Sequence, residues 1–240
     1  MAEKLKYFVN GQFRESKTDK WYDLHNPSTG ETTGQAPCCT NDEVLEAIAA
    51  AKAAYPGWSA TPAIKRAQIL YRVRELILER MDELTMSVAK ENGKVWAESE
   101  GDVLKAKEGT ELATQVPSLM MGESIMDASR GYDTVKYREP LGVFAGIVPV
   151  NFPAMIPFGW MAPTCIAAGN TLVLKAASLT PKTAMLFAQL YKDAGVPDGV
   201  INVVTCSRNE INTILEHPDV KGITLSLIHI SEPTRQAEIS

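Results

Sequence analysis

The sequence contains little cysteine and little histidine. Among its 240 residues are four cysteines and three histidines. Cys38 and Cys39 are adjacent and no Cys-x-x-Cys pair occurs, so neither a disulfide framework nor a zinc site is indicated. We therefore expect reduced thiols and no bound metal, with Cys165 packed in the core because it lies in an apolar helical stretch.

A surplus of basic residues is also absent. Lys and Arg total 24 against 29 for Asp and Glu, and the net charge of −5 gives no electrostatic footprint for nucleic acid. No apolar run approaches the length of a membrane span, and the start Met1-Ala-Glu-Lys-Leu-Lys6 lacks a secretory signal segment. With 45% hydrophobic residues, the chain is long enough to bury a large core, and we expect a soluble, cytoplasmic globular protein.

The first 131 residues predict a short β preface followed by a helical layer. Asn10-Gly11 between aromatic and β-branched residues predicts a hairpin over residues 7–13, and residues 21–26 predict a further strand. Capping residues and the 3.6-residue period predict four helices. They cover residues 40–55, a segment opening at Pro62, residues 81–91 and residues 96 to about 116, with Pro56-Gly57 ending the first.

From residue 132 the pattern changes to strands that alternate with helices. Residues 132–138 alternate like an exposed strand, and a βαβ series begins at about residue 142. Its strands lie near Val143, Thr171, Val200 and Gly222, with helices near Ile156, Pro181 and Asn209. This pattern predicts an α/β fold, a doubly wound parallel Rossmann-type sheet preceded by a β-hairpin and long helices.

Two strand ends carry candidate chemistry. The apolar run Val143–Val148 is followed by Asn151 just before Phe152-Pro153, and an amide at the mouth of such a sheet can donate to a developing oxyanion. The alternative is that Asn151 caps the helix near Met155, and both roles can coexist. Lys175 ends the strand that begins at Thr171, where an ammonium can bind ribose hydroxyls, although a solvated structural lysine is the commoner use of the residue.

These motifs resemble the coenzyme-binding half of the aldehyde dehydrogenase superfamily. The resemblance rests on the strand Gly142-Val-Phe-Ala-Gly-Ile-Val-Pro149, Asn151-Phe-Pro153, Gly169-Asn-Thr171 and Lys175, in that order. Three further segments resemble the CoA-acylating methylmalonate-semialdehyde dehydrogenases: Pro117–Glu123, Glu98–Val103 and His217–Lys221. The likeness extends from about Lys6 to about Thr224.

The resemblance implies that the chain is a fragment. Family members are about twice as long and carry the nucleophilic Cys in the half that is missing. Residues 1–224 then form the N-terminal coenzyme-binding part, helical to about 131 and a βαβ sheet from about 142. Residues 225–240 depart from the family pattern after Lys221-Gly-Ile-Thr224 and resemble translated sequencing-adapter sequence, so we expect a non-native tail; a divergent natural C-terminus is the alternative.

The resemblance also implies roles for single residues. Asn151 matches the oxyanion amide, Lys175 matches the lysine on the adenosine ribose, and Lys105 stands where the subfamily holds the substrate carboxylate with an Arg. Ser178 stands where the family usually has Glu, and losing that carboxylate makes NADP admissible, although NAD ranks first. The remaining expected cofactor contacts are Ile147, Val148, Pro149, Val150 and Ala177, and Cys206 is expected near the nucleotide.

The implied activity is NAD(P)-dependent oxidation of an aldehyde, specifically methylmalonate or malonate semialdehyde, to an acyl-CoA by the full-length enzyme, with CoA as co-substrate. Such an enzyme is expected to form a homodimer or homotetramer. Lys105 weakens the case for this substrate, and the segment Pro153–Pro163 is one residue longer than the subfamily's usual form. A hydrolytic aldehyde dehydrogenase and a non-catalytic nucleotide-binding module therefore remain alternatives.

Overall fold

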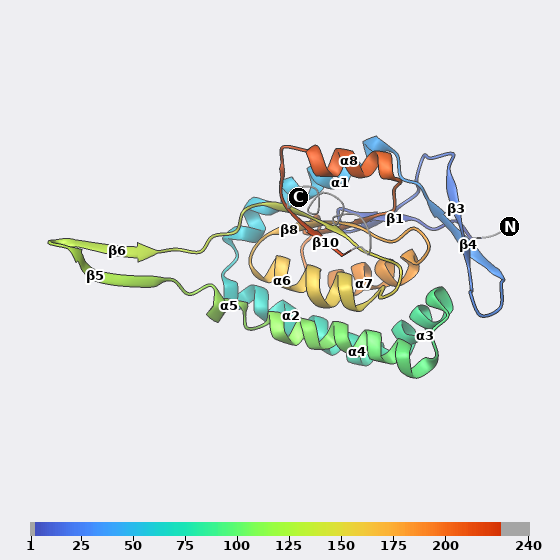
Figure 1. Ribbon diagram of the computed structural model, residues 1–240, viewed down its shortest axis with the longest axis horizontal. Coiled ribbons are helices and arrows are strands. Elements are labelled where there is room, and N and C mark those ends of the chain that lie inside the picture. The colour runs from blue at the N-terminus through green and yellow to red at the C-terminus, as the bar shows by residue number, and fades with distance from the viewer. Residues whose placement is uncertain (1–2, 227–240) are drawn as a thin grey trace, which may run out of the picture.

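The computed structural model describes residues 3–226, which are built around a six-stranded sheet (Figure 1). Its strand order is β10-β7-β8-β9-β1-β2. β10 (Val220–Leu225), β7 (Val143–Ile147), β8 (Thr171–Lys175) and β9 (Ile201–Val204) are mutually parallel. β1 (Tyr7–Val9) pairs antiparallel with β9 and with β2 (Gln12–Arg14). The predicted doubly wound parallel sheet is confirmed.

The strand order reverses between β7 and β10, because β7 pairs with β8 on one side and with the last strand on the other. Sheets of this kind bind ligands at such a switch point, outside the carboxyl ends of the strands. The candidate site is therefore expected beyond Ile147, Lys175 and Val204.

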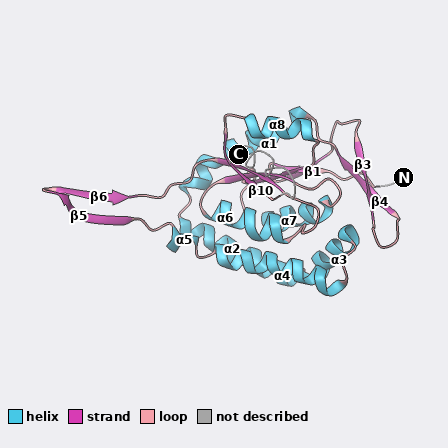
Figure 2. Cartoon of the chain, viewed as in Figure 1, coloured by secondary structure: helices cyan, strands magenta, loops and turns pink. Residues whose placement is uncertain are grey.

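Helices cover both faces of the sheet, which explains why β8 and β9 are almost wholly apolar and buried. α1 (Asn41–Ala60) packs on β7, β8 and β9, with α8 (Arg208–Glu216) beside it. α6 (Ala162–Ala167) and α7 (Pro181–Asp193) cover the opposite face. α2 (Ala63–Glu79) and α4 (Trp96–Ala113) form a further layer over α6, with α3 (Met81–Asn92) packed on α4 and α7 (Figure 2).

The first helix corrects a sequence prediction. Thr40 and Glu43 form the predicted capping box, but α1 continues through Pro56 to Ala60 instead of ending at Pro56-Gly57. The last turn is held by Trp58, which is 2% exposed and donates from Nε1 to the carbonyl of Ile166 at 3.0 Å. Burial of this side chain outweighs the single backbone hydrogen bond that a helical proline removes.

The other helices of the N-terminal half lie where they were predicted, except that α4 ends at Ala113 and a short α5 (Val116–Leu119) follows. The hairpin turn at Asn10-Gly11 is also confirmed, since both residues have positive φ. Two strands were not predicted: β4 (Thr32–Pro37), which pairs with β3 (Trp21–His25), and β5 (Glu123–Ser129).

β5 and β6 (Tyr132–Lys136) form a hairpin arm that projects from the body, at the left of Figure 1. Every residue of both strands is exposed. The exposed side chains include large apolar ones, among them Met126 at 81%, Tyr132 at 72% and Ile125 at 62%.

The segment after β7 forms a π-helix, η1 (Ile156–Met161), that leads directly into α6. A π-turn contains more residues than an α-turn, so η1 is wider than a regular α-helix. η1 crosses α4 at two glycines: a Cβ on Gly109 would lie 2.1 Å from the Gly159 carbonyl oxygen.

β10 extends one residue into the segment that was predicted to be non-native. Leu225 pairs with Ile147, and the Ser226 N–H donates to the carbonyl of Ile147 at 3.1 Å. The remainder of that predicted tail, residues 227–240, lies outside the described residues. Within residues 3–226, no helix has the length and apolar character needed to cross a bilayer.

Candidate functional site

A cavity of about 520 Å³ opens at the carboxyl ends of β7, β8 and β9. This volume lies within the range of roughly 300–1,000 Å³ that is typical of small-molecule and cofactor pockets. Three of the predicted cofactor residues line it: Ile147, Lys175 and Ser178. The rest of its lining comes from Tyr22, Leu225 and residues before and along α8, namely Cys206, Ser207, Arg208, Ile211, Asn212 and Leu215.

Lys175 is positioned by the sheet, because its residue pairs with Ile147 on one side and Val204 on the other. Burial lowers the pKa of its ammonium, and the nearby Cys206 and Cys38 act in the opposite direction. Burial also raises the pKa of Cys206 to about 12. At neutral pH Cys206 is therefore a protonated thiol close to the Lys175 side chain.

The other predicted cofactor residues do not line this cavity. Val148 and Ala177 are buried at 4% exposure each, Pro149 is half-buried, and Val150 is 45% exposed. The Val148 N–H donates to the carbonyl of Lys175 at 3.4 Å, which joins the two strand ends. Their part in cofactor binding stays a prediction.

Sequence reasoning missed the contribution of α8. Ser207 caps this helix, and Glu210 completes a capping box by accepting from the Ser207 N–H at 3.0 Å. The signal was present, since Ser207-x-x-Glu210 directly follows an apolar strand and so marks a helix that begins at the carboxyl edge of the sheet. It brings Arg208 into the lining.

Asn151 lies in the loop between β7 and η1 and its residue is exposed. The helix-capping alternative is wrong, because the Met155 N–H donates instead to Oδ1 of Asp102 at 2.7 Å. Within residues 3–226 the Asn151 side chain forms no hydrogen bond, so its amide is free to act on another group.

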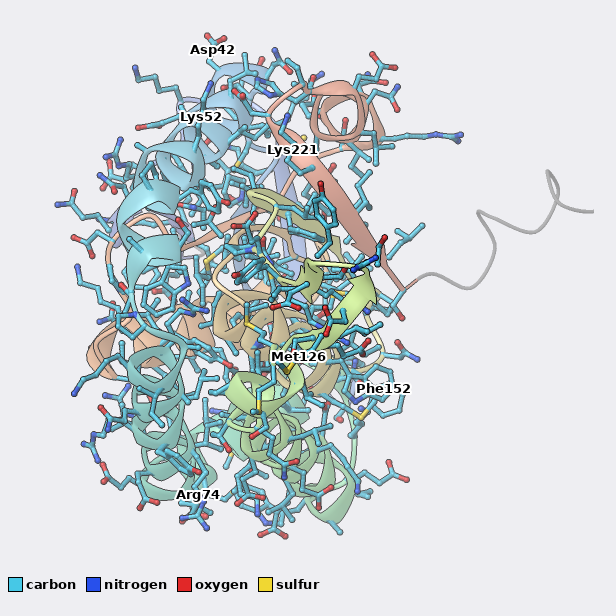
Figure 3. All side chains as sticks on the ribbon, turned by 90° about the vertical axis from the view of Figure 1, so that its left-hand side faces the viewer. Asp42, Lys52, Arg74, Met126, Phe152 and Lys221 are labelled. Atoms are coloured by element: carbon cyan, nitrogen blue, oxygen red, sulfur yellow. The ribbon has the colours of Figure 1, made fainter. Side chains whose placement is uncertain are left out.

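Three residues of the helical layer hold this loop. Asn92 donates from Nδ2 to the carbonyl of Val150 at 2.6 Å, and the Lys94 ammonium lies 4.0 Å from the centre of the Phe152 ring. Lys94 also pairs with Asp102 at 3.1 Å. Figure 3 shows Phe152 on the side of the molecule where β10 also ends. The loop that carries Asn151 is thus fixed from outside the sheet, by residues that the sequence analysis did not single out.

Asp102 is a buried charge with a complete set of partners. Its side chain has 0% exposure and that of Lys94 has 15%. Desolvation raises the pKa of Asp102, whereas the Met155 N–H and the Lys94 ammonium favour the ionised form. Asp102 therefore couples α4 to the start of η1.

Lys105 lies one turn after Asp102 on α4 and is exposed. Its ammonium pairs with Glu108 at 2.6 Å, and the residue does not line the cavity at the strand ends. Contact between Lys105 and a substrate carboxylate remains a prediction.

A second cavity, of about 370 Å³, lies between α3, α7 and the first strands and contains none of the predicted site residues. Glu91 lines it and accepts from the backbone N–H groups of Lys182 and Thr183, the latter at 2.9 Å. Burial raises the pKa of Glu91 to about 7. Glu91 satisfies the start of α7, which makes it a structural carboxylate.

The sequence profile of the aldehyde dehydrogenase family matches residues 13–226. The chain belongs to this family of oxidoreductases. It is 44% identical over 220 residues to the human mitochondrial methylmalonate-semialdehyde/malonate-semialdehyde dehydrogenase (acylating), covering 92% of this chain and 41% of that protein. The chain thus spans less than half the length of this relative.

Solved structures agree in fold. A putative methylmalonate-semialdehyde dehydrogenase from Sinorhizobium meliloti 1021, complexed with NAD, superposes with a TM-score of 0.91 at 33% identity, covering 94% of this chain and 46% of that one. An E. coli NADP-dependent enzyme superposes with a TM-score of 0.89 at 34% identity, covering 93% and 46%. The fold and the subfamily resemblance predicted from the motifs are confirmed.

Proposed function

We propose that this chain is the N-terminal coenzyme-binding part of an NAD(P)-dependent aldehyde dehydrogenase that converts methylmalonate or malonate semialdehyde to an acyl-CoA. The observation that carries the proposal is the cavity at the strand switch point, with Lys175 at the end of β8 in its lining. Its apolar residues Ile147, Ile211 and Leu215 fit an adenine ring, and the Lys175 ammonium fits ribose hydroxyls. The human relative's name and the NAD bound to the S. meliloti protein support this assignment.

NAD, when bound, accepts a hydride from the aldehyde carbon. The chain's own residues hold the cofactor and stabilise the negative charge that develops on the aldehyde oxygen. Lys175 binds the adenosine ribose, and Asn151 donates from its amide to the oxyanion that forms when a thiolate attacks the aldehyde. Asn92 and Asp102 keep the Asn151 loop in place, so that this donor is oriented before the reaction begins.

The attacking thiolate comes from a part of the enzyme that this chain does not contain. Burial raises the pKa of Cys39, Cys165 and Cys206 to about 12, so these thiols stay protonated at neutral pH. Cys38 is buried and lies beside the Tyr22 hydroxyl at 3.5 Å. We therefore expect no aldehyde oxidation by the purified 240-residue chain, and NAD(P)-dependent turnover by it would contradict the proposal.

CoA acylation is tested in the complete enzyme, assembled from the full reading frame. With CoA and methylmalonate semialdehyde, the thioester passes to CoA with loss of carbon dioxide, and mass spectrometry of the products is expected to detect the acyl-CoA. A free acid as the main product would favour the hydrolytic alternative. Lys105 does not decide between the two, because its ammonium already pairs with Glu108. If the complete protein binds nucleotide but oxidises no aldehyde, the result would favour the alternative of a non-catalytic nucleotide-binding module.

Replacement of the proposed oxyanion donor gives a second test. In the complete enzyme, Asn151→Ala should lower kcat by about 10²-fold or more, because a lost oxyanion donor typically costs 10²–10³ in rate. The KM for the cofactor should change little, because Asn151 does not line the nucleotide cavity. An unchanged kcat would remove Asn151 from the mechanism.

The hairpin arm supports a homodimer or homotetramer of the complete enzyme. Exposed apolar residues on a projecting hairpin, such as Met126 and Tyr132, are typical of a surface that another subunit covers. Light scattering of the complete enzyme with and without residues 123–136 would test this assembly. A cytoplasmic location remains part of the proposal, although the human relative is described as mitochondrial.

A further inference from the structure

We propose that the second cavity, between α3, α7 and the first strands, binds a small apolar amine whose ammonium hydrogen-bonds to the Glu91 carboxylate. The lining of this cavity shares no residue with the lining of the cavity at the strand ends. The inference therefore goes beyond the proposed function, and either of the two can fail without the other.

The walls of the second cavity suit an alkyl chain. Its volume of about 370 Å³ lies within the range of roughly 300–1,000 Å³ that is typical of small-molecule sites. Its apolar side chains are those of Leu5, Phe13, Met86, Met185 and Leu186. Phe13 and Met86 are 42% and 43% exposed, so the cavity is open to solvent on their side. Methionine side chains adapt to an irregular ligand, and two of them face this space.

Glu91 supplies a buried acceptor for a charged donor. The residue is 6% exposed and lines the cavity. One carboxylate oxygen accepts from the Lys182 N–H, and the other accepts from the Thr183 N–H at 2.9 Å. An ionised carboxylate offers about four lone-pair sites, so each oxygen can accept one hydrogen bond more. Hydrogen bonds between an ammonium and a carboxylate are among the strongest that such a site can form.

The charges around the cavity favour a cation over an anion. Its lining contains three carboxylates and two ammonium groups, namely those of Glu3, Glu83 and Glu91 and those of Lys90 and Lys182. The Lys182 ammonium is already bound to the carbonyl of Thr33 at 2.8 Å. At the exposed rim, Glu3 and Glu83 stand against Lys90 alone. An anionic head group would be repelled by these carboxylates, whereas an ammonium would be attracted.

Ionisation of Glu91 should control this binding. Burial raises the pKa of Glu91 to about 7, although the backbone N–H groups of Thr183 and Lys182 and the Lys182 ammonium favour the ionised form. A bound ammonium also favours the ionised form, so below pH 7 the amine has to displace a proton. At pH 5.5 only about 3% of the carboxylate is ionised, and the affinity for an amine should be about 30-fold lower than at pH 8.

The experiment measures binding to the 240-residue chain by isothermal titration calorimetry at pH 8 and pH 5.5. The probes are octylammonium, 1-octanol and octanoate, which have the same chain length and differ in the charge of the head group. At pH 8 we expect octylammonium to bind about 10-fold more tightly than 1-octanol, and octanoate to bind more weakly than either.

Two variants locate the site. Glu91→Gln should reduce the affinity for octylammonium to that for 1-octanol and remove its dependence on pH. Met86→Trp places an indole at the open side of the cavity and should weaken the binding of both probes by about 10-fold or more. Met126→Trp, on the exposed hairpin arm, is the matched control and should leave both affinities unchanged. Because Met86 is partly exposed, the Met86→Trp result does not depend on whether Glu91→Gln folds.

Equal affinities for octylammonium and 1-octanol at pH 8 would overturn the inference, and so would an octylammonium affinity that is the same at pH 5.5. Binding that survives Met86→Trp would place the amine elsewhere on the chain. Displacement of octylammonium by NAD would place it in the cavity at the strand ends. Either result would also overturn the inference, while the proposed function would stand.

Discussion

Two buried carboxylates join the helical layer to the helices that follow β7 and β8. Asp102 of α4 accepts from the Met155 N–H at the start of η1, and Glu91 of α3 accepts from the N–H groups that begin α7. Each satisfies backbone donors that no intrahelical partner can satisfy. Both therefore fix segments that follow a sheet strand and lead away from the candidate site.

Removal of the Asp102 carboxylate should destabilise the chain strongly. Asp102→Ala strands the Lys94 ammonium, which is 15% exposed, and the Met155 N–H, so we expect a loss of about 3 kcal/mol or more in the free energy of unfolding. Asp19→Ala, at an exposed position, is the control and should change stability by less than about 0.5 kcal/mol. Urea denaturation measures both. If Asp102→Ala lowers the free energy of unfolding no more than Asp19→Ala does, the contacts of Asp102 with Lys94 and Met155 do not stabilise the fold.

Glu91 should make stability depend on pH. Its folded-state pKa of about 7 exceeds the ordinary value of 4.5. The contribution of Glu91 to the free energy of unfolding is therefore fully present below pH 4.5 and is lost as the pH rises through 7. The shift corresponds to about 3 kcal/mol. Glu91→Gln cannot titrate, so the unmodified chain should lose stability relative to this variant between pH 5 and pH 8. A stability difference that does not change with pH would contradict the raised pKa.

The sequence predicted the residues whose chemistry is tied to strand ends, and it missed the residues that support them. Lys175 and Ser178 follow an apolar strand and so were assigned to the site, and both line the cavity. Asp102 and Asn92 lie among the charged and polar residues of helices, where such side chains are usually solvated. Only the three-dimensional contact of α4 with η1 distinguishes Asp102 from its exposed neighbours.

At the scale of elements, two glycines set the distance between α4 and η1. A Cβ on Gly109 would meet the Gly159 carbonyl oxygen at 2.1 Å, and a Cβ on Gly159 would meet the Ala106 Cα at 2.9 Å. The two backbones thus pack without intervening side chains. This close packing holds η1, and the Asn151 loop before it, against the helical layer.

Two alanine substitutions in the same helix should have opposite effects. Gly109→Ala should destabilise the chain by about 2–3 kcal/mol or more, because backbone atoms must move apart. Gly101→Ala, where no atom lies within 4 Å of the added Cβ, should stabilise α4 by up to about 1 kcal/mol. Thermal unfolding followed by circular dichroism compares them. Equal shifts in Tm would show that the contact between the glycines is not tight.

Elements with a strong period or an explicit cap were predicted, and those that depend on distant packing were not. The α1 cap at Thr40 and the Asn10-Gly11 turn are local signals, and both are confirmed. Pro56 suggested a helix end because the burial of Trp58 against Ile166 is a long-range contact. β5 was missed because the exposed strand lacks apolar-polar alternation over its length.

At the scale of the whole molecule, the chain corresponds to less than half of the relatives that it matches. It covers 41% of its human relative and 46% of the S. meliloti structure. The parallel sheet, its switch point and the cavity at the strand ends are nevertheless all formed by described residues. Cofactor binding should therefore be separable from catalysis.

The cavity at the switch point is proposed as the nucleotide site of this chain. Hydrogen exchange followed by mass spectrometry, with and without NAD or NADP, can locate the segments that the cofactor covers. We expect slower exchange in residues 175–178 and 206–212, which line the cavity at the ends of β8 and β9, and unchanged exchange around Met86 and Met185 in the second cavity. Unchanged exchange in both segments at saturating cofactor, or protection confined to the second cavity, would show that the cavity at the switch point is not the nucleotide site.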